Sequence, residues 1–269
     1  GYTSEEVSGK NKWERNKKLL EKSIEENPND PYLYYNLGKV HYLTKNYVDA
    51  INMFNKAMKF NIDYNLEYVQ DLVITYGYSL LSLQKYEEAL AILKYEPYYK
   101  NFADYYFLIG LIEMNIGNFE EAINNFKKSI GKTEKIIGTS SYLSYYNIGV
   151  IFEVLGDYGQ ALSYYEKCGT YIPASKRISE ILKSGKIKKQ IQDFIERGDL
   201  VKAKYLLNII ENYLKDDPEI YSIKAVIFMV ENKLIEARMT LQQGLQLFSN
   251  DQDLLFNLEY LNSIEKTSD

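Results

Sequence analysis

The chain has 269 residues, 46% of them hydrophobic and 26% charged, which excludes a disordered chain and allows a long core. Its net charge of −5 gives it no general attraction to nucleic acid or to anionic membranes. A single cysteine, Cys168, excludes an internal disulfide bond and fits a reducing compartment. No window approaches the ~18 apolar residues of a membrane span. We therefore expect a cytoplasmic protein.

The first predicted element is a lone helix. Residues 1–30 are expected to form a linker and a half-repeat helix that runs from about Lys10 to Asn27. Its apolar residues are expected to pack on the first complete hairpin, because an array of helices needs a cap over its terminal apolar face; they are Trp13, Leu19, Leu20 and Ile24.

A pattern of small and large residues then recurs six times. Gly38 precedes Ala50 by twelve residues, and the same interval separates three further pairs: Gly77 and Ala89, Gly110 and Ala122, Gly149 and Ala161. A large apolar residue follows each of these four alanines by four positions: Phe54, Leu93, Phe126 and Tyr165. Two weaker copies surround Ala203 and Ala237. Self-similarity at such a period indicates stacked helical repeats.

Each copy divides into two helices. Tyr34, Gly38 and His41 share one face of the first helix, and Ala50 and Phe54 share one face of the second. The small residues let the two backbones approach, and the large residues fill the space beside them. One hairpin cannot bury both of its faces, so neighbouring hairpins must stack.

The order Tyr34, Leu37-Gly38, Ala50, Phe54 and Ala57 resembles the tetratricopeptide repeat (TPR). This resemblance implies an all-α fold, a right-handed superhelical solenoid of antiparallel helix hairpins with about six repeats plus capping helices. The expected array covers residues 31–250, and residues 251–269 are expected to form a C-terminal capping helix. The expected repeats lie near 31–64, 70–103, 103–136, 142–175, 184–217 and 218–251. Insertions relative to a repeat of ~34 residues fall around 62–69, 131–141 and 174–184.

Residues that could perform catalysis are scarce, so we expect no enzyme activity, no cofactor and no metal. His41 is the only histidine, and we expect it in the core. Cys168 is expected to pack near the end of a second helix. Asp251 and Asp253 match a D-x-D pattern that holds metal in many sugar-nucleotide enzymes. Here they open the last helix, where carboxylates cap free amides.

First-helix residues opposite the core line the concave surface of a TPR array. In this register we predict that eleven of them bind a protein or an extended peptide: Tyr35, Asn36, Lys39, Tyr42, Tyr78, Phe107, Leu111, Met114, Tyr146, Asn147 and Val150. Tyrosine offers apolar area and a hydroxyl at low entropic cost. The amides of Asn36 and Asn147 could bridge peptide groups. The alternative is that Tyr35-Asn36 and Tyr146-Asn147 only seal hairpins together.

Two other features bear on the partner. The stretch 176–204 holds nine basic and four acidic residues, a local excess of +5, and is a competing site for an acidic partner. Asp104 stands among the concave positions where chaperone-binding members of the family hold a carboxylate. Because Asp104 would repel a carboxylate, we do not expect a chaperone-tail adaptor.

The segment from Gly1 to Gly38 resembles a second family. Gly1-Tyr2, Lys10, Arg15-Asn16, Leu19-Leu20 and Asn27-Pro28-Asn29-Asp30 are similar to the junction before the C-terminal repeats of bacterial family 2 glycosyltransferases. The resemblance implies a non-catalytic scaffold within a larger enzyme, where it holds or selects a protein acceptor. A stand-alone TPR peptide sensor and an assembly adaptor are the alternatives, and either could be a homo-oligomer.

Overall fold

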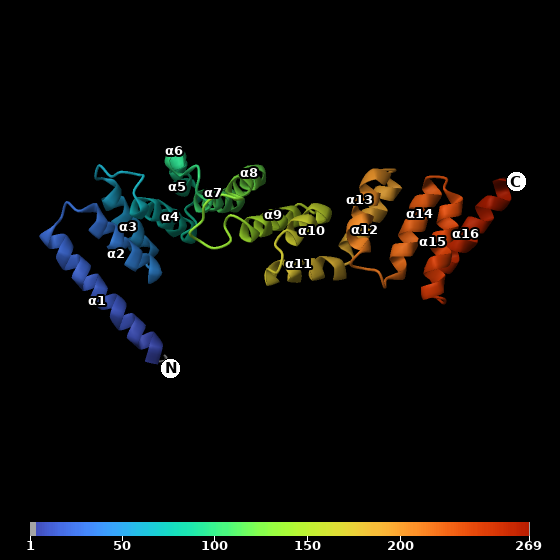
Figure 1. Cartoon of the computed structure of the whole chain (residues 1–269), viewed down its shortest axis with the longest axis horizontal. Coiled ribbons are helices and arrows are strands. Elements are labelled where there is room, and N and C mark those ends of the chain that lie inside the picture. The colour runs from blue at the N-terminus through green and yellow to red at the C-terminus, as the bar shows by residue number, and fades with distance from the viewer. Residues whose placement is uncertain (1–3, 269) are drawn as a thin grey trace. The chain divides into compact units, whose positions relative to one another are not determined.

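The structure, a computed structural model, describes the backbone of residues 4–268 and the side chains of residues 12–264. Gly1, Tyr2 and the side chain of Lys10, on which the glycosyltransferase resemblance partly rests, lie outside these described residues. Residues 4–268 form helices α1 to α16 and one 3₁₀ helix, η1, without a β-strand (Figure 1). The predicted all-α fold is therefore confirmed.

The chain divides into two compact units, residues 1–151 and residues 152–269. Within the described part of the chain, no helix has both the length and the hydropathy that a membrane span requires.

The first unit begins with α1 (Ser4–Glu26), which packs against α2 (Pro31–Leu43). The prediction that Leu19 packs on the first hairpin is wrong, since Leu19 is 58% exposed. Two regular hairpins follow in this unit, α2 with α3 (Tyr47–Met58) and α7 (Ala103–Ile116) with α8 (Phe119–Ser129). Between them α4 (Glu67–Ser82) packs against both α2 and α7, so the first helices of successive hairpins are neighbours. The unit ends within α9 (Tyr142–Val154).

The predicted pairing of a glycine with a large residue is confirmed in both regular hairpins. A Cβ atom on Gly38 would lie 2.6 Å from the ring of Phe54. A Cβ atom on Gly110 would lie 2.7 Å from the ring of Phe126. Both rings are fully buried, so they occupy the space that the missing side chains leave between the helices.

The second hairpin departs from the predicted pattern. Its second helix consists of three short pieces: α5 (Tyr86–Ala89), η1 (Leu90–Tyr95) and α6 (Glu96–Tyr99). A 3₁₀ helix returns to the same face after three residues and not after about four. Ile92, three residues after Ala89, is therefore buried, 3.3 Å from where a Cβ atom on Gly77 would lie, and Leu108 of α7 lies closer to that position, at 2.5 Å. The prediction for Leu93 is wrong, since Leu93 is 42% exposed.

Pro97 accounts for the change of helix type. Proline has no N–H and disfavours α conformation in the residue before it. The Leu93 carbonyl therefore cannot accept the α-helical hydrogen bond that the N–H of residue 97 would otherwise donate. The N–H of Glu96 donates to the Leu93 carbonyl in its place, which leaves the Ile92 carbonyl without its α-helical donor. The hydroxyl of the buried Tyr105 donates to both carbonyls, at 3.0 Å to Ile92 and 3.2 Å to Leu93.

The insertion at 131–141 forms an ordered loop against the start of α7. Thr133 and Phe102 form an isolated parallel bridge, the only β-type pairing among the described residues. The Asp104 carboxylate accepts hydrogen bonds from the N–H groups of Lys135 and Ile136 and from the hydroxyl of Thr139. Asp104 is only 3% exposed, and its bonds therefore hold the loop onto the hairpin.

The second unit contains the remaining helices: α10 (Tyr158–Glu166), α11 (Ile172–Lys183), α12 (Lys186–Glu196), α13 (Leu200–Glu211), α14 (Pro218–Val230), α15 (Leu234–Leu247) and α16 (Gln252–Ser268). The hairpins are α12 with α13 and α14 with α15, and α16 packs on the last of them (Figure 1). The insertion predicted around 174–184 forms most of α11. Asp251 caps α16, because its carboxylate accepts from the N–H of Leu254 at 3.0 Å.

Candidate functional site

The eleven predicted binding residues lie on α2, α4, α7 and α9 of the first unit. Their side of these helices is called the first-helix face below. Two of the eleven are part of the core: Tyr35 and Phe107 are each only 6% exposed. The Phe107 ring packs 5.5 Å from the ring of Phe126, which is the ring that also fills the space beside Gly110. In this conformation neither Tyr35 nor Phe107 presents its side chain as an open anchor.

Tyr35 and Lys39 meet at a residue that the sequence did not single out, Asp71. The Tyr35 hydroxyl donates to Asp71 Oδ2 at 2.7 Å, and Lys39 Nζ lies 2.7 Å from the same oxygen. Lys39 Nζ also donates to the Tyr35 hydroxyl at 3.2 Å. Asp71 lies one turn before Ile74, on the same side of α4, so the helical register of repeat two could have identified it.

These contacts define the charge state of the cluster. Burial, and then the hydrogen bond to Asp71, raise the pKa of Tyr35 to about 12. Burial by itself would lower the pKa of Lys39, but the hydrogen bonds to Asp71 and Tyr35 outweigh it and the pKa is raised. At neutral pH the cluster therefore holds a charged lysine against a carboxylate, with a neutral phenol beside them.

The other residues of the first-helix face are half-buried, so they combine contact with the core and an accessible surface. On α2, α4 and α7 these are Asn36, Lys39, Tyr42, Tyr78, Leu111 and Met114. Tyr42 and Tyr78 also pack against the buried core, together with Leu81. Burial raises the pKa of Tyr78, so its hydroxyl stays neutral. The result is an aromatic and aliphatic strip beside the Lys39–Asp71 pair.

Helix α9 carries the remaining predicted residues, Tyr146, Asn147 and Val150, all half-buried. Asn147 donates to the carbonyl of Leu143 in its own helix at 2.8 Å, and Asn36 makes the same bond to Tyr32 in α2. Within the described residues the side-chain oxygen of Asn36 accepts no hydrogen bond, so it remains able to pair with a peptide N–H.

Asp104 does not face a ligand as a bare carboxylate. The Asp104 carboxylate is buried, and the donors of the hydrogen bonds described above all belong to the 131–141 loop. The expectation of an open Asp104 on the concave surface is therefore wrong, because the insertion covers this side chain, and its repulsion of a carboxylate stays a prediction.

The basic stretch 176–204 is largely neutralised by neighbouring helices. The carboxylates that pair with it from outside are Glu153 with Arg177, Asp217 and Glu219 with Lys188, and Glu231 with Lys204. These four carboxylates reduce the local excess of +5 to +1. The competing site predicted from the sequence is therefore a set of ion pairs between helices and not an open basic patch.

Candidate catalytic side chains have structural surroundings. His41 is 5% exposed, and burial lowers its pKa, so it is neutral at pH 7 although Nδ1 lies 3.7 Å from Asp49. Cys168 is 5% exposed, and burial raises the pKa of its thiol to about 11, which disfavours the reactive thiolate. Within the described part of the chain, no group of three or more His, Cys, Asp or Glu residues is placed to hold a metal ion.

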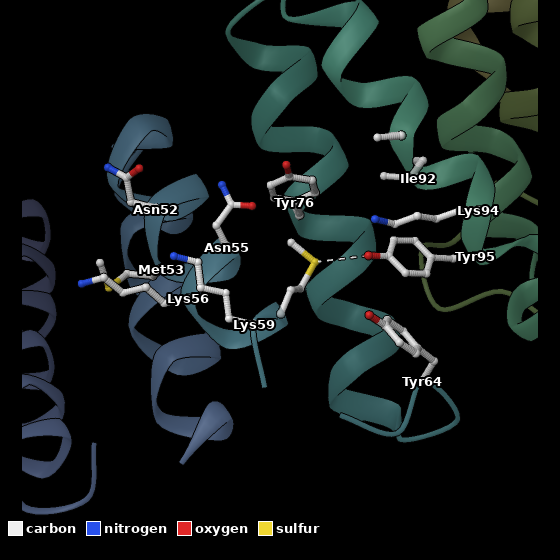
Figure 2. Close-up of a pocket in the computed structure, with 12 residues that line it drawn as sticks. Asn52, Met53, Asn55, Lys56, Lys59, Tyr64, Tyr76, Ile92, Lys94 and Tyr95 are labelled. Carbon is white, nitrogen blue, oxygen red and sulfur yellow. Dashed lines mark hydrogen bonds between the residues drawn. The ribbon is translucent and has the colours of Figure 1, made fainter. Parts of the chain in front are cut away.

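A pocket of about 730 Å³ lies apart from the first-helix face, between α3, α4 and η1 (Figure 2). Its lining comprises Asn52, Met53, Asn55, Lys56, Met58, Lys59, Tyr64, Tyr76, Ala91, Ile92, Lys94 and Tyr95. In Figure 2 Lys94 and Tyr95 extend from η1 toward α3, and the Tyr95 hydroxyl donates to the Met58 sulfur at 3.6 Å.

Comparison with known families identifies the repeats. One tetratricopeptide repeat model matches residues 19–52, and a second matches residues 103–131 and 142–174. The second model begins at Ala103 and Tyr142, which are the first residues of α7 and α9. These three segments are therefore tetratricopeptide repeats, as the resemblance implied. No curated protein matches the sequence.

Two solved structures with a similar fold are each less than 25% identical in sequence to this chain. A crystal structure of MamA has a TM-score of 0.52 at 19% identity, over 67% of this chain and 99% of that one. The structure of YrrB, described as a TPR protein with an unusual peptide-binding site, has a TM-score of 0.51 at 22% identity, over 64% of this chain and 87% of that one. These similarities show the fold. The family models and the description of YrrB concern tetratricopeptide repeats, and none of the comparisons supports the glycosyltransferase junction.

Proposed function

We propose that this chain is a binding scaffold that holds an extended polypeptide on the first-helix face of its first unit. The observation that carries this function is the strip of half-buried residues on three neighbouring helices: Tyr42 on α2, Tyr78 on α4, and Leu111 and Met114 on α7. Half-buried tyrosine and methionine side chains are preordered by the core yet keep accessible area, so a partner immobilises few rotamers when it binds them. The description of YrrB as a peptide-binding TPR protein is consistent with this use of the fold.

The Lys39–Asp71 pair adds specificity at one end of the strip. Both side chains are partly exposed, at 40% and 31%, and each retains hydrogen-bonding capacity toward a partner. The buried residues Tyr35 and Phe107 support the face from beneath. We expect Tyr42, Tyr78 and Met114 to be the anchors, because an energetic hot spot needs accessible area that becomes buried on binding.

The test is a selection of random dodecapeptides displayed on phage against the full chain, with affinities of the selected synthetic peptides measured by fluorescence anisotropy. The double variant Tyr42→Ala/Met114→Ala is expected to weaken binding by more than about tenfold, since each lost anchor costs on the order of 1–2 kcal/mol. Val48 on α3 and Leu93 on η1 are exposed apolar residues away from this face, and Val48→Ala/Leu93→Ala is the matched control. Peptides that bind the anchor variant as well as the unchanged chain would contradict the proposed face.

The glycosyltransferase parentage rests on a separate observation, the sequence resemblance of residues 1–38. We propose on that basis that the scaffold is the C-terminal region of a bacterial family 2 glycosyltransferase and holds its protein acceptor. A tethered binding surface would raise the effective concentration of a weakly bound acceptor. The coding sequence upstream of Gly1 provides the test, because a parent without a glycosyltransferase domain contradicts the assignment. A stand-alone peptide sensor or an assembly adaptor would then remain, and neither has support from the comparisons.

A further inference from the structure

We propose that the pocket between α3, α4 and η1 binds a small anionic ligand that carries phosphate groups (Figure 2). This site is distinct from the polypeptide-binding function, since none of its lining residues belongs to the eleven predicted from the sequence.

The charge of the pocket is its most unusual property. Lys56, Lys59 and Lys94 line it, and no lining residue is acidic, although the whole chain carries a net charge of −5. Within the described residues no carboxylate forms an ion pair with any of these three lysines. Six other lysines of the same unit each pair with a carboxylate: Lys17, Lys22, Lys39, Lys85, Lys128 and Lys135. The pocket therefore concentrates uncompensated positive charge, which attracts an anion.

The irregular second hairpin creates this arrangement. Because η1 is a 3₁₀ helix, Ile92 packs into the core beside Gly77, and the residues that follow it adopt directions that an α-helix would not give them. Lys94 and Tyr95 then extend toward α3, where Asn55 and Lys59 face the same space (Figure 2). Lys56 also lines the pocket, but its Nζ lies 5.9 Å from the centre of the ring of Tyr34, a residue of α2 outside the lining.

The lining favours phosphate over carboxylate. Lysine is a compact point charge that binds phosphate oxygens from many directions, whereas planar two-point recognition of a carboxylate favours arginine, and no arginine lines the pocket. Burial raises the pKa of Tyr64 and of Tyr95, so both phenols remain neutral and do not repel an anion. The half-buried Tyr64 ring, whose centroid lies 4.8 Å from that of the buried Tyr95 ring, offers an apolar face to a sugar or a base.

The size of the pocket favours a small molecule over an acidic polypeptide. Its volume of about 730 Å³ lies within the range of roughly 300–1,000 Å³ that is typical of small-molecule sites. The lining comes from one interface, between α3 and the second hairpin, whereas an extended peptide would contact a longer row of helices. A ligand of nucleotide size, with two or three phosphate groups, would match both the space and the positive charges of Lys59 and Lys94.

Isothermal titration calorimetry of the full chain at low ionic strength tests this site with three probes: ATP, inorganic tripolyphosphate and inorganic phosphate. We expect one site per chain for ATP and for tripolyphosphate, weaker binding of inorganic phosphate, and affinities that fall as salt is added. Tighter binding of ATP than of tripolyphosphate would identify contacts of the base or sugar. Equal binding would assign the affinity to phosphate alone, and either result supports the site.

The decisive variant is Lys59→Gln/Lys94→Gln, which removes two positive charges from the pocket. We expect it to weaken ATP or tripolyphosphate binding by at least about tenfold, because a charge-assisted hydrogen bond is worth ~1.5–3 kcal/mol. Lys18→Gln/Lys100→Gln removes the same charge from exposed lysines outside the pocket and is expected to leave the affinity nearly unchanged. Ala91→Phe should block the pocket by volume without any change of charge, and circular dichroism checks that each variant is folded.

Three results would overturn the site. The first is a wild-type chain that binds none of the phosphate probes. The second is an equal loss of affinity in the pocket variants and in the control variant, which would indicate attraction to general surface charge. The third is tighter binding of a hexaglutamate peptide than of ATP, which would assign the pocket to an acidic polypeptide.

Discussion

Lys39 Nζ lies 2.7 Å from Asp71 Oδ2, and this ion pair joins α2 to α4 on the first-helix face. The Tyr35 hydroxyl donates to the same carboxylate, so three side chains from two hairpins form one connected group. The contact fixes the position of a charged pair beside the tyrosine strip, and it explains why Tyr35 is buried where the sequence suggested an exposed anchor. A first-helix position can therefore serve packing between hairpins and still shape the adjoining surface.

Replacing Asp104 with alanine should release the 131–141 loop from α7. The change removes the hydrogen bonds that Asp104 accepts from Lys135, Ile136 and Thr139, each typically worth about 0.5–1.5 kcal/mol net. Hydrogen exchange followed by mass spectrometry should show faster exchange in residues 131–141. Asp216→Ala removes an exposed carboxylate and is the control. Unchanged protection of the loop in Asp104→Ala would show that other contacts hold it.

Replacing Gly110 with alanine should destabilise the α7–α8 hairpin, because the new methyl group would lie 2.7 Å from the Phe126 ring. Overpacking of this kind costs ~1–3 kcal/mol, measurable as a lower urea midpoint of the first unit. Gly117 has a positive φ of 95°, and a methyl group there would have no other atom within 4 Å, so Gly117→Ala reports backbone strain alone. Adding Phe126→Leu to Gly110→Ala should recover part of the loss, and failure of that rescue would argue against a steric cause.

Stability should fall at alkaline pH through tyrosines that stay protonated in the folded chain. Burial and a carboxylate acceptor raise the pKa of Tyr35 and of Tyr106 to about 12, from an ordinary value of 10.0. Between these values the unfolded chain has lost protons that the folded chain retains. Their contribution is therefore complete below pH 10 and is lost as the pH rises from 10 to 12.

Urea unfolding at intervals from about pH 9 to about pH 12 measures this loss as a falling free energy of unfolding. The double variant Tyr35→Phe/Tyr106→Phe cannot ionise at these positions, so its stability should decline less steeply with pH. The exposed Tyr32 shows no such burial, and Tyr32→Phe is the control. An identical slope in the wild type and the double variant would assign the alkaline loss to other groups.

Much of the fold followed from spacing alone. The twelve-residue interval between Gly38 and Ala50 predicts a hairpin because close approach of two helices depends on residues near each other in the chain. The pattern failed at Leu93, where Pro97 changes the helix type and moves the inward position to Ile92. The proline was visible in the sequence, but the switch to a 3₁₀ helix also needs the Tyr105 hydroxyl, which comes from the next hairpin.

The candidate sites depended more on tertiary contacts. The sequence by itself determined the helical repeats and the row of first-helix residues. It also showed that residues able to perform catalysis are scarce, with His41 the only histidine. Only the tertiary structure decided that Asp71 joins Tyr35 and Lys39, that distant carboxylates neutralise the 176–204 stretch, and that Lys59 and Lys94 line one pocket. The physical reason is range: helix formation and hairpin packing are set by neighbours in sequence, whereas charge and accessibility are set by whichever side chains the folded chain brings within a few ångströms.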